Sequence, residues 1–246
     1  MTKINYGFTL AEVLITLGII GVVAAMTMPS LIANHQEKIT VTKVKKVYSI
    51  LSQAYLIAVE EYGTPDEWGT TARDAGDEND ENYSAGNAVI IREKLFKGLQ
   101  KVSICDKAKK QKACNIADAY YWPDRSKDSS LSTQTASAGT ADGTGFLIIA
   151  NSPGESRGPG VLNKTYAIIY ADINGTKKPN TYGKDLFAFY LTNDNITPLG
   201  TKDETFWSFD TCFNSGVSCT AWVVFNENTD YLHCNDLSWS GKRTCK

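Results

Sequence analysis

The chain has 246 residues, an apolar share of 42% and a formal net charge of −2. That apolar share is enough for one folded domain with an added segment, and it excludes a chain that is disordered throughout. The even balance of acidic and basic residues implies no basic face. We therefore expect protein partners and no nucleic acid.

All six cysteines lie after residue 100, in polar, turn-rich sequence. An even number in that setting predicts disulfides and an oxidising compartment. A zinc site is the alternative, but it needs close cysteine pairs such as C-x2-C, and the chain has only two histidines. Sequence alone does not prove the connectivity, and we expect neighbours to pair in short loops: Cys105–Cys114, Cys212–Cys219 and Cys234–Cys245.

The first informative segment is residues 8–32, FTLAEVLITLGIIGVVAAMTMPSLI, which is apolar apart from Glu12 and a few hydroxyl groups. As a helix it would extend roughly 37 Å at about 1.5 Å per residue, more than the roughly 30 Å hydrocarbon layer of a bilayer. A secretory signal peptide would be more basic at its start, have a shorter apolar part and end in small residues. We therefore predict a single transmembrane helix.

Glu12 is the exceptional residue of this run. A carboxylate near the start of a membrane helix costs about 2.5–3.5 kcal/mol on insertion scales, and less near the interface, so it needs compensation. If the chain were cut between Gly7 and Phe8, the new α-amino group would be a cation able to pair with Glu12 of a neighbouring subunit. The alternative is an uncut anchor whose Glu12 lies at the level of the headgroups.

Residues 7–12, Gly-Phe-Thr-Leu-Ala-Glu, follow a short polar leader and open the apolar helix. This pattern resembles the prepilin cleavage and methylation motif of type IV pilin-like proteins and type II secretion pseudopilins. The resemblance implies that a prepilin peptidase cuts between Gly7 and Phe8 and methylates the amino group of Phe8. It also implies that Glu12 is the assembly carboxylate and that Pro29 stands where many such pilins carry a helix-kinking proline.

The resemblance further implies a chain that spans the bacterial inner membrane once. Its carboxy-terminal head would lie in the periplasm and, after assembly, in a periplasmic or extracellular fibre. Four lysines after the apolar run oppose that orientation, since positive charge favours the cytoplasmic side. These are Lys38, Lys43, Lys45 and Lys46. The predicted disulfides support the periplasm, and we follow them.

The sequence beyond the apolar run contains no helix breaker before Gly63, and apolar residues recur at three- and four-residue steps from Val44 to Tyr62. This pattern predicts an amphipathic continuation of the same helix, which ends at residues 63–65. The expected parts are a leader peptide, 1–7; a transmembrane and assembly helix, 8–33; the amphipathic second half of the helix, 34–62; and a periplasmic globular head, 63–246.

Apolar segments separated by Gly, Pro and Asn predict β-strands at 145–150, 164–172 and 186–191, with one more at 221–225. A short helix is expected at 87–99. The Ser/Thr/Ala/Gly-rich tract at 126–144 is expected to be an exposed, mobile insertion. The predicted fold is α+β and pilin-like: the long helix packs on an antiparallel sheet, with a disulfide-rich carboxy-terminal region.

Two charged loops have a structural and a functional interpretation. The acidic stretch 66–86 is typical of a solvated loop, with a metal cluster as the alternative. The lysine-rich segment between Cys105 and Cys114 is typical of a stapled surface loop, with a binding patch as the alternative.

The segment 172–185 places Asp172, Asn174 and Asp185 around two glycines. Such residues shape turns, because Asn and Asp bond to nearby backbone amides and Gly adopts positive φ. The same oxygen-bearing side chains suit calcium, although the spacing does not match an EF-hand. The segment also resembles, in part, a loop of bacterial pseudopilin-like proteins, and major pseudopilins bind calcium in a loop. Calcium is therefore the one cofactor that we consider.

These features predict a structural subunit of a type II secretion pseudopilus or a type IV pilus. Its partners would be other pilin or pseudopilin subunits and the secretion or pilus assembly machinery. The alternative is a binding module at the fibre tip, either an adhesin or a minor pilin that binds DNA or another ligand. An enzyme tethered by its amino terminus is disfavoured, because the sequence has no Gly-rich phosphate loop, no G-x-S-x-G and no paired histidines.

Overall fold

The computed structural model describes residues 9–70, 81–99, 102–105, 111–129, 131, 136–152 and 160–245, and only the backbone of 81–85 and 111–112. By its internal contacts the chain divides into two units, Met1–Ile39 and Thr40–Lys246. The helix α1, Leu10–Tyr62, contributes to both units. At about 1.5 Å per residue its 53 residues measure about 80 Å, so the single long helix predicted from the sequence is confirmed.

The end of α1 follows the chemistry of its last residues. Gly63 has a φ of +76°, the left-handed conformation that commonly closes a helix, and its N–H donates to Val59 O at 3.0 Å. Trp68 Nε1 then donates to Gly63 O at 2.8 Å and buries its ring. The expected acidic loop continues from here, and its central part, 71–80, lies outside the described residues, as does the lysine-rich segment 106–110.

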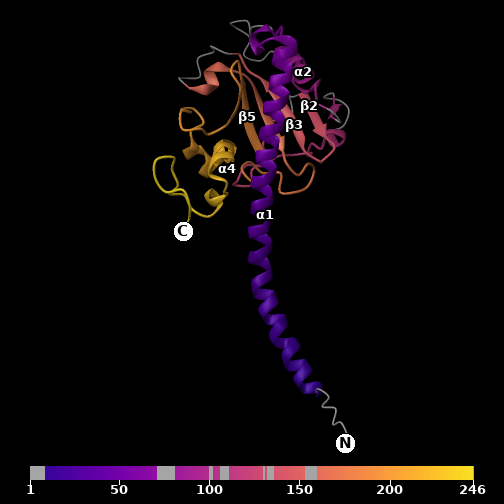
Figure 1. Cartoon of the computed structure of the whole chain (residues 1–246), viewed down its shortest axis with the longest axis vertical. Helices are drawn as coiled ribbons and strands as arrows, with labels where there is room; N and C mark the ends of the chain where they lie inside the picture. Colours follow the sequence, from indigo (N-terminus) through magenta and orange to yellow (C-terminus); the bar gives the residue numbers. More distant parts are fainter. Residues whose placement is uncertain are drawn as a thin grey trace, which may run out of the picture. The chain divides into compact units, whose positions relative to one another are not determined.

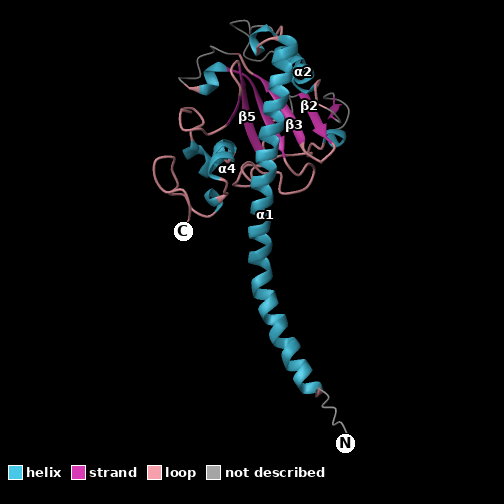
Figure 2. Ribbon diagram, viewed as in Figure 1, coloured by secondary structure: helices cyan, strands magenta, loops and turns pink. Residues whose placement is uncertain are grey.

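The second unit contains, within the described residues, a six-stranded antiparallel sheet whose strands lie in sequence order (Figure 2). The strands are Val102–Cys105 (β1), Ala136–Thr140 (β2), Gly145–Ala150 (β3), Thr165–Asp172 (β4), Leu186–Thr192 (β5) and Ile196–Pro198 (β6). The three predicted central strands are confirmed almost to the residue. Strands β1, β2 and β6 were not predicted.

Helices cover one face of the sheet. Val44, Leu51 and Ala58 of α1 are buried against it, together with residues of α2, Glu81–Phe96, and α4, Thr220–Asn226. Figure 1 shows α1 in front of the sheet, between the labelled strands β5 and β3, with α4 on the β5 side. Most neighbouring buried positions of α1 are three or four residues apart, and Val44, Leu51 and Ala58 are seven apart, because such spacing places them on one face of the helix. Helix α2 begins earlier and ends earlier than the predicted range 87–99.

Irregular segments cover the other face of the sheet. Phe146 and Ile148 of β3 contribute to the core under the helices, whereas Leu147 contributes to the second core. The same alternation divides β4 and β5 between the two cores. Strands buried on both faces have continuous apolar runs, which is why these three were recognisable in the sequence.

The expectation of an exposed insertion at 126–144 is wrong for β2. This strand lies inside the sheet, and Ala138 and Gly139 are buried. Small residues are needed here because a Cβ atom at Gly139 would lie 2.5 Å from Cys114 Cα in the adjacent helical turn η2, Gln111–Cys114. A composition typical of mobile segments therefore reflects a close approach of two backbones.

The predicted strand at 221–225 is also wrong, because the segment forms helix α4. Residues 220–224 are all buried. A short apolar run without polar positions has no periodicity that separates a strand from a buried helix. The beginning of α4 is fixed against β5, where Ala188 N donates to Thr220 Oγ1 at 2.8 Å.

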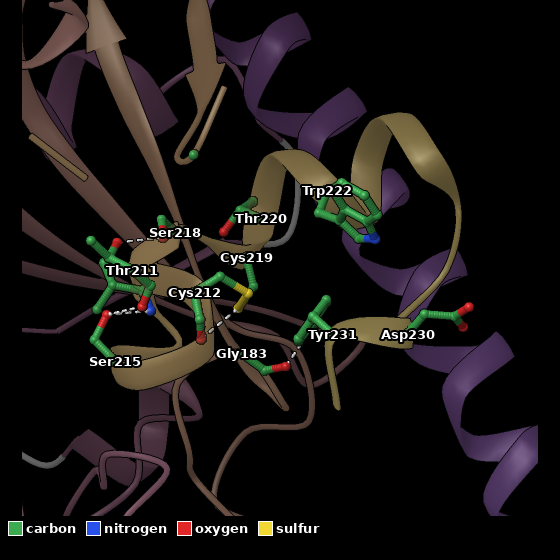
Figure 3. Close-up of a disulfide and its surroundings, with 12 residues drawn as sticks. Gly183, Thr211, Cys212, Ser215, Ser218, Cys219, Thr220, Trp222, Asp230 and Tyr231 are labelled. Carbon is green, nitrogen blue, oxygen red and sulfur yellow. Dashed lines mark hydrogen bonds between the residues drawn. A yellow bond between two sulfur atoms is a disulfide. The ribbon is translucent and has the colours of Figure 1, made fainter. Parts of the chain in front are cut away.

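The structure contains the three neighbour disulfides expected from the sequence: Cys105–Cys114, Cys212–Cys219 and Cys234–Cys245. Figure 3 shows the second, which joins α3, Cys212–Ser215, to the turn before α4. Beside it, the Tyr231 hydroxyl donates to Gly183 O at 2.7 Å, and the Trp222 ring stacks on Phe209 with centroids 4.2 Å apart. The carboxy-terminal region is therefore part of the core.

Replacing Gly139 by Ala should destabilise the head, because the added methyl group would meet the Cys114 backbone. Overpacking of this kind costs about 1–3 kcal/mol. Gly86→Ala in α2 is the matched control: nothing lies within 4 Å of its added Cβ, and Ala should stabilise the helix by about 0.5–1 kcal/mol. Urea unfolding compares the two variants. Equal stability would contradict the close approach of β2 and η2.

Candidate functional site

The first candidate site lies at the start of α1. Gly7 and Phe8, the predicted processing residues, lie outside the described residues. Thr9 N and Thr9 Oγ1 donate to Glu12 Oε2 at 2.8 and 2.7 Å, and Glu12 N donates to Thr9 Oγ1 at 3.3 Å. This reciprocal arrangement is a capping box, with Thr9 as the N-cap and Glu12 at the third helical position.

The capping box gives Thr9 a role that the sequence analysis missed. The spacing Thr-x-x-Glu before an apolar run is the signal that would have found it. Only one carboxylate oxygen of Glu12 is engaged: in the described part of the chain, Oε1 accepts no hydrogen bond. At this site Thr9 and Glu12 cap the end of the helix with hydrogen bonds to each other. The second carboxylate oxygen of Glu12 stays available to a partner from outside.

The apolar side chains that follow Glu12 are uncovered in the first unit. Leu14, Ile19 and Met26 are 62%, 60% and 76% exposed. Among the described residues, α1 is the one helix that is long and apolar enough to cross a membrane. No residue in its most apolar stretch of 18 residues is buried. This surface needs cover from lipid or from other chains.

Pro29 lies inside α1, and the helix is continuous on both sides of it. Proline has no N–H, so one carbonyl in the preceding turn loses its helical donor. Nearby hydroxyl groups bond back to the helix: Thr27 Oγ1 donates to Val23 O and Ser30 Oγ donates to Thr27 O, both at 3.0 Å. The helix continues through Pro29 despite the missing hydrogen bond.

Three of the lysines that opposed the expected orientation have partners in the second unit. The contacts are Lys43 Nζ with Ile173 O at 2.8 Å, Lys45 Nζ with Glu227 Oε1 at 2.5 Å, and Lys46 Nζ with Asp142 Oδ2 at 2.6 Å. Exposed pairs of this kind each contribute about 0–1 kcal/mol. Packing within the head therefore accounts for these charges without reference to a membrane.

The second candidate site is the loop between β4 and β5. Asp185 is 3% exposed and accepts hydrogen bonds from Asn180 N at 2.7 Å, Thr181 N at 2.5 Å and Asn174 Nδ2 at 3.0 Å. Its carboxylate thus gathers three N–H donors of its own loop. Burial nevertheless raises the pKa of Asp185, since desolvation outweighs these hydrogen bonds.

Asp172, at the end of β4, is fully buried. It accepts hydrogen bonds from the Tyr120 hydroxyl at 2.9 Å and from Asn174 N at 3.2 Å. Burial and the nearby Asp185 carboxylate raise the pKa of Asp172 to about 8. The structure therefore brings the three predicted residues of this loop together, and it adds Tyr120 from a distant segment.

The hydrogen bonds to both carboxylates are those of turn-shaping residues. Among the described residues, no group of three or more His, Cys, Asp or Glu side chains could hold a metal ion. Among the described residues, Asn174 Oδ1 and Asn180 Oδ1 are buried without a hydrogen-bond partner. The geometry favours a turn, and calcium binding stays a prediction.

Two comparisons with protein families bear on these sites. Residues 30–219 match the model of a family of unknown function, DUF6613, which is more than half of the chain. The chain belongs to this family. The prokaryotic N-terminal methylation motif matches residues 2–28. No curated protein and no solved structure matches the chain.

The methylation motif covers the capping box and the predicted cleavage site. It is the prepilin signature of type IV pilins and pseudopilins, so the resemblance drawn from residues 7–12 is confirmed. The signature marks this member of the family as a pilin-like subunit and implies processing by a prepilin peptidase and assembly with other pilins. The DUF6613 match ends at residue 219, so α4 and the third disulfide lie beyond it.

Replacing Asp185 by Asn should destabilise the head by about 2–3 kcal/mol. The carboxylate now accepts hydrogen bonds from N–H donors, and the amide NH₂ of Asn would face one of these donors without being able to accept. Asp194→Asn, on the exposed turn after β5, is the matched control and should shift stability by less than about 0.5 kcal/mol. Urea unfolding should give the same loss with calcium and with a chelator. A loss that appears only in calcium would make Asp185 a calcium ligand.

Stability should also depend on pH through Asp172. Its folded pKa of about 8 lies above the usual range, so unfolding releases a proton between about pH 4 and about pH 8, and stability falls as pH rises through this window. Asp185, whose pKa is also raised, acts in the same direction. Asp172→Asn should flatten the slope measured by urea unfolding. An unchanged pH dependence of the unfolding free energy would mean that ionisation of the Asp172 carboxyl group does not destabilise the folded head.

Proposed function

We propose that the chain is a structural subunit of a type II secretion pseudopilus or a type IV pilus, a pseudopilin or minor pilin without a catalytic role. The observation that carries the proposal is the capped Glu12 at the start of an uncovered apolar helix with the prepilin signature. Lipid covers such a helix in the precursor. The helices of neighbouring subunits cover it in a fibre.

Processing supplies the cation that Glu12 lacks. Hydrolysis of the peptide bond between Gly7 and Phe8 leaves a carboxylate on the leader and an α-ammonium group on Phe8. Methylation of that nitrogen keeps it basic, so it remains a cation at neutral pH. Because Oε2 of Glu12 serves the capping box, Oε1 is available to the ammonium group of a neighbouring subunit. An ion pair in this low-dielectric setting would set the register between subunits.

The proposed organisation follows the sequence. Residues 1–7 are the leader, 8–33 the transmembrane and assembly helix, 34–62 its amphipathic second half, and 63–246 the head. The boundary between the two contact units, at Ile39 and Thr40, falls shortly after the proposed membrane helix. Three disulfides support a head in the oxidising periplasm.

Glu12→Ala should leave cleavage after Gly7 largely intact and block incorporation into fibres, because it keeps the cleaved bond and removes the pairing carboxylate. Mass spectrometry of the mature amino terminus reports cleavage, and immunodetection in sheared fibres reports incorporation. Glu60→Ala, which removes an exposed carboxylate from the head part of α1, is the matched control and should assemble normally. Normal fibre content in Glu12→Ala would refute the charge-pairing step. A mature protein that retains residues 1–7 would refute the whole proposal.

A further inference from the structure

Asn174 is followed by Gly175, and this is the one Asn-Gly pair in the sequence. In such a pair the backbone nitrogen of the glycine can attack Cγ of the asparagine side chain, because glycine has no Cβ to hinder the approach. The reaction releases the side-chain nitrogen, so the asparagine can lose its amide group without an enzyme. The pair lies in the loop between β4 and β5, beside two buried carboxyl groups.

The fold requires a glycine at position 175. Its φ is +68°, in the left-handed region that side chains disfavour, and an added Cβ would lie 2.8 Å from Gly143 O. The same Cβ would lie 3.2 Å from Asn115 Cβ. Asn115 is itself fixed, since its Nδ2 donates to Thr140 O at 2.8 Å. The backbone of Gly175 is therefore packed against fixed neighbours in the folded head.

The side chain of Asn174 is held as well. Its Nδ2 donates to Asp185 Oδ2 at 3.0 Å, and its backbone N donates to Asp172 Oδ1 at 3.2 Å. Both acceptors are buried. An attack on Cγ requires the side chain to leave Asp185 and the peptide plane of Gly175 to turn. Loss of one hydrogen bond to a carboxylate alone disfavours the attacking conformation by about tenfold or more.

We propose that Asn174 is a modification site that the fold protects, and that its modification in the unfolded chain prevents refolding. In the reaction, the bond between Gly175 N and Asn174 Cγ forms and the bond between Cγ and Nδ2 breaks. Nδ2 leaves as ammonia and takes the proton of the Gly175 amide. Water then opens the cyclic imide. Opening at Cγ gives an aspartate at position 174, and opening at the backbone carbonyl gives an isoaspartate, whose main chain runs through Cγ.

Both products would disturb the loop. An aspartate would bring a third carboxylate to Asp172 and Asp185, and it lacks the N–H that Asp185 now accepts. An isoaspartate would lengthen the main chain next to Gly175, where the backbone has no spare room. Subunits that stay unfolded would thus be lost irreversibly from the pool that can assemble. This last consequence rests on the proposed function, whereas the protection of Asn174 does not.

The first test compares loss of the amide in folded and unfolded protein. Full-length protein in detergent, with its disulfides intact, is incubated at neutral pH with and without unfolding urea. Mass spectrometry of the peptide that contains Asn174 reports the replacement of NH₂ by OH. Loss should be at least about tenfold slower in the folded protein. A synthetic peptide of residues 170–180, with and without urea, controls for urea itself. An equal or faster rate in the folded protein would overturn the proposal.

The second test addresses refolding. Asn174→Asp should shift the unfolding equilibrium, measured in urea with a chelator present, toward the unfolded state by at least about tenfold. Asn195→Asp is the matched control and should unfold like the wild type. Asn195 is exposed, and its Oδ1 accepts from Thr197 Oγ1, as an aspartate would. Equal stability of the two variants would overturn the second half of the proposal.

Discussion

The apolar side chains between Leu10 and Ile32 have no cover in their own unit, and the interpretation of the molecule depends on this constraint. Most of the large ones expose more than half of their surface. Burying one such side chain is worth about 1.5–3 kcal/mol, so the segment is strongly driven into lipid or against other helices. The capping box between Thr9 and Glu12 satisfies the first turn without outside help. A precursor and an assembled subunit can therefore share the same helix start.

The sequence was informative where side chains alone decide the structure. Strands β3, β4 and β5 are apolar on both faces, and α1 combines an apolar run with an amphipathic stripe, so their patterns survive without tertiary information. Strand β2 was missed because its glycine is explained by a tertiary contact. Gly139 packs directly against the backbone of Cys114, which is distant in sequence, and leaves no room for a side chain. Helix α4 was misassigned because full burial erases periodicity. At the first site the motif identified Glu12, and the Thr-x-x-Glu spacing could also have identified Thr9. Which carboxylate oxygen of Glu12 the capping box engages needed coordinates.

A count of charges does not show which of them are paired. The lysines after the apolar run count toward a cytoplasmic orientation, yet Lys45 and Lys46 have carboxylate partners in the head. The sum of charges therefore carries less information than the pairing of each one. Pairing depends on the tertiary structure, so it cannot be deduced from the composition.

The carboxy-terminal segment beyond residue 219 supplies Trp222, whose ring lies flat on Phe209 inside the stretch that the family shares. Its last residues are held in turn, since Cys245 N donates to Asp230 Oδ2 at 2.7 Å and Cys245 is bonded to Cys234. A relative that lacked this segment would leave an aromatic ring of the common core open to solvent. Variation at the end of the chain should therefore be correlated with variation at position 209, and the two would have to evolve together.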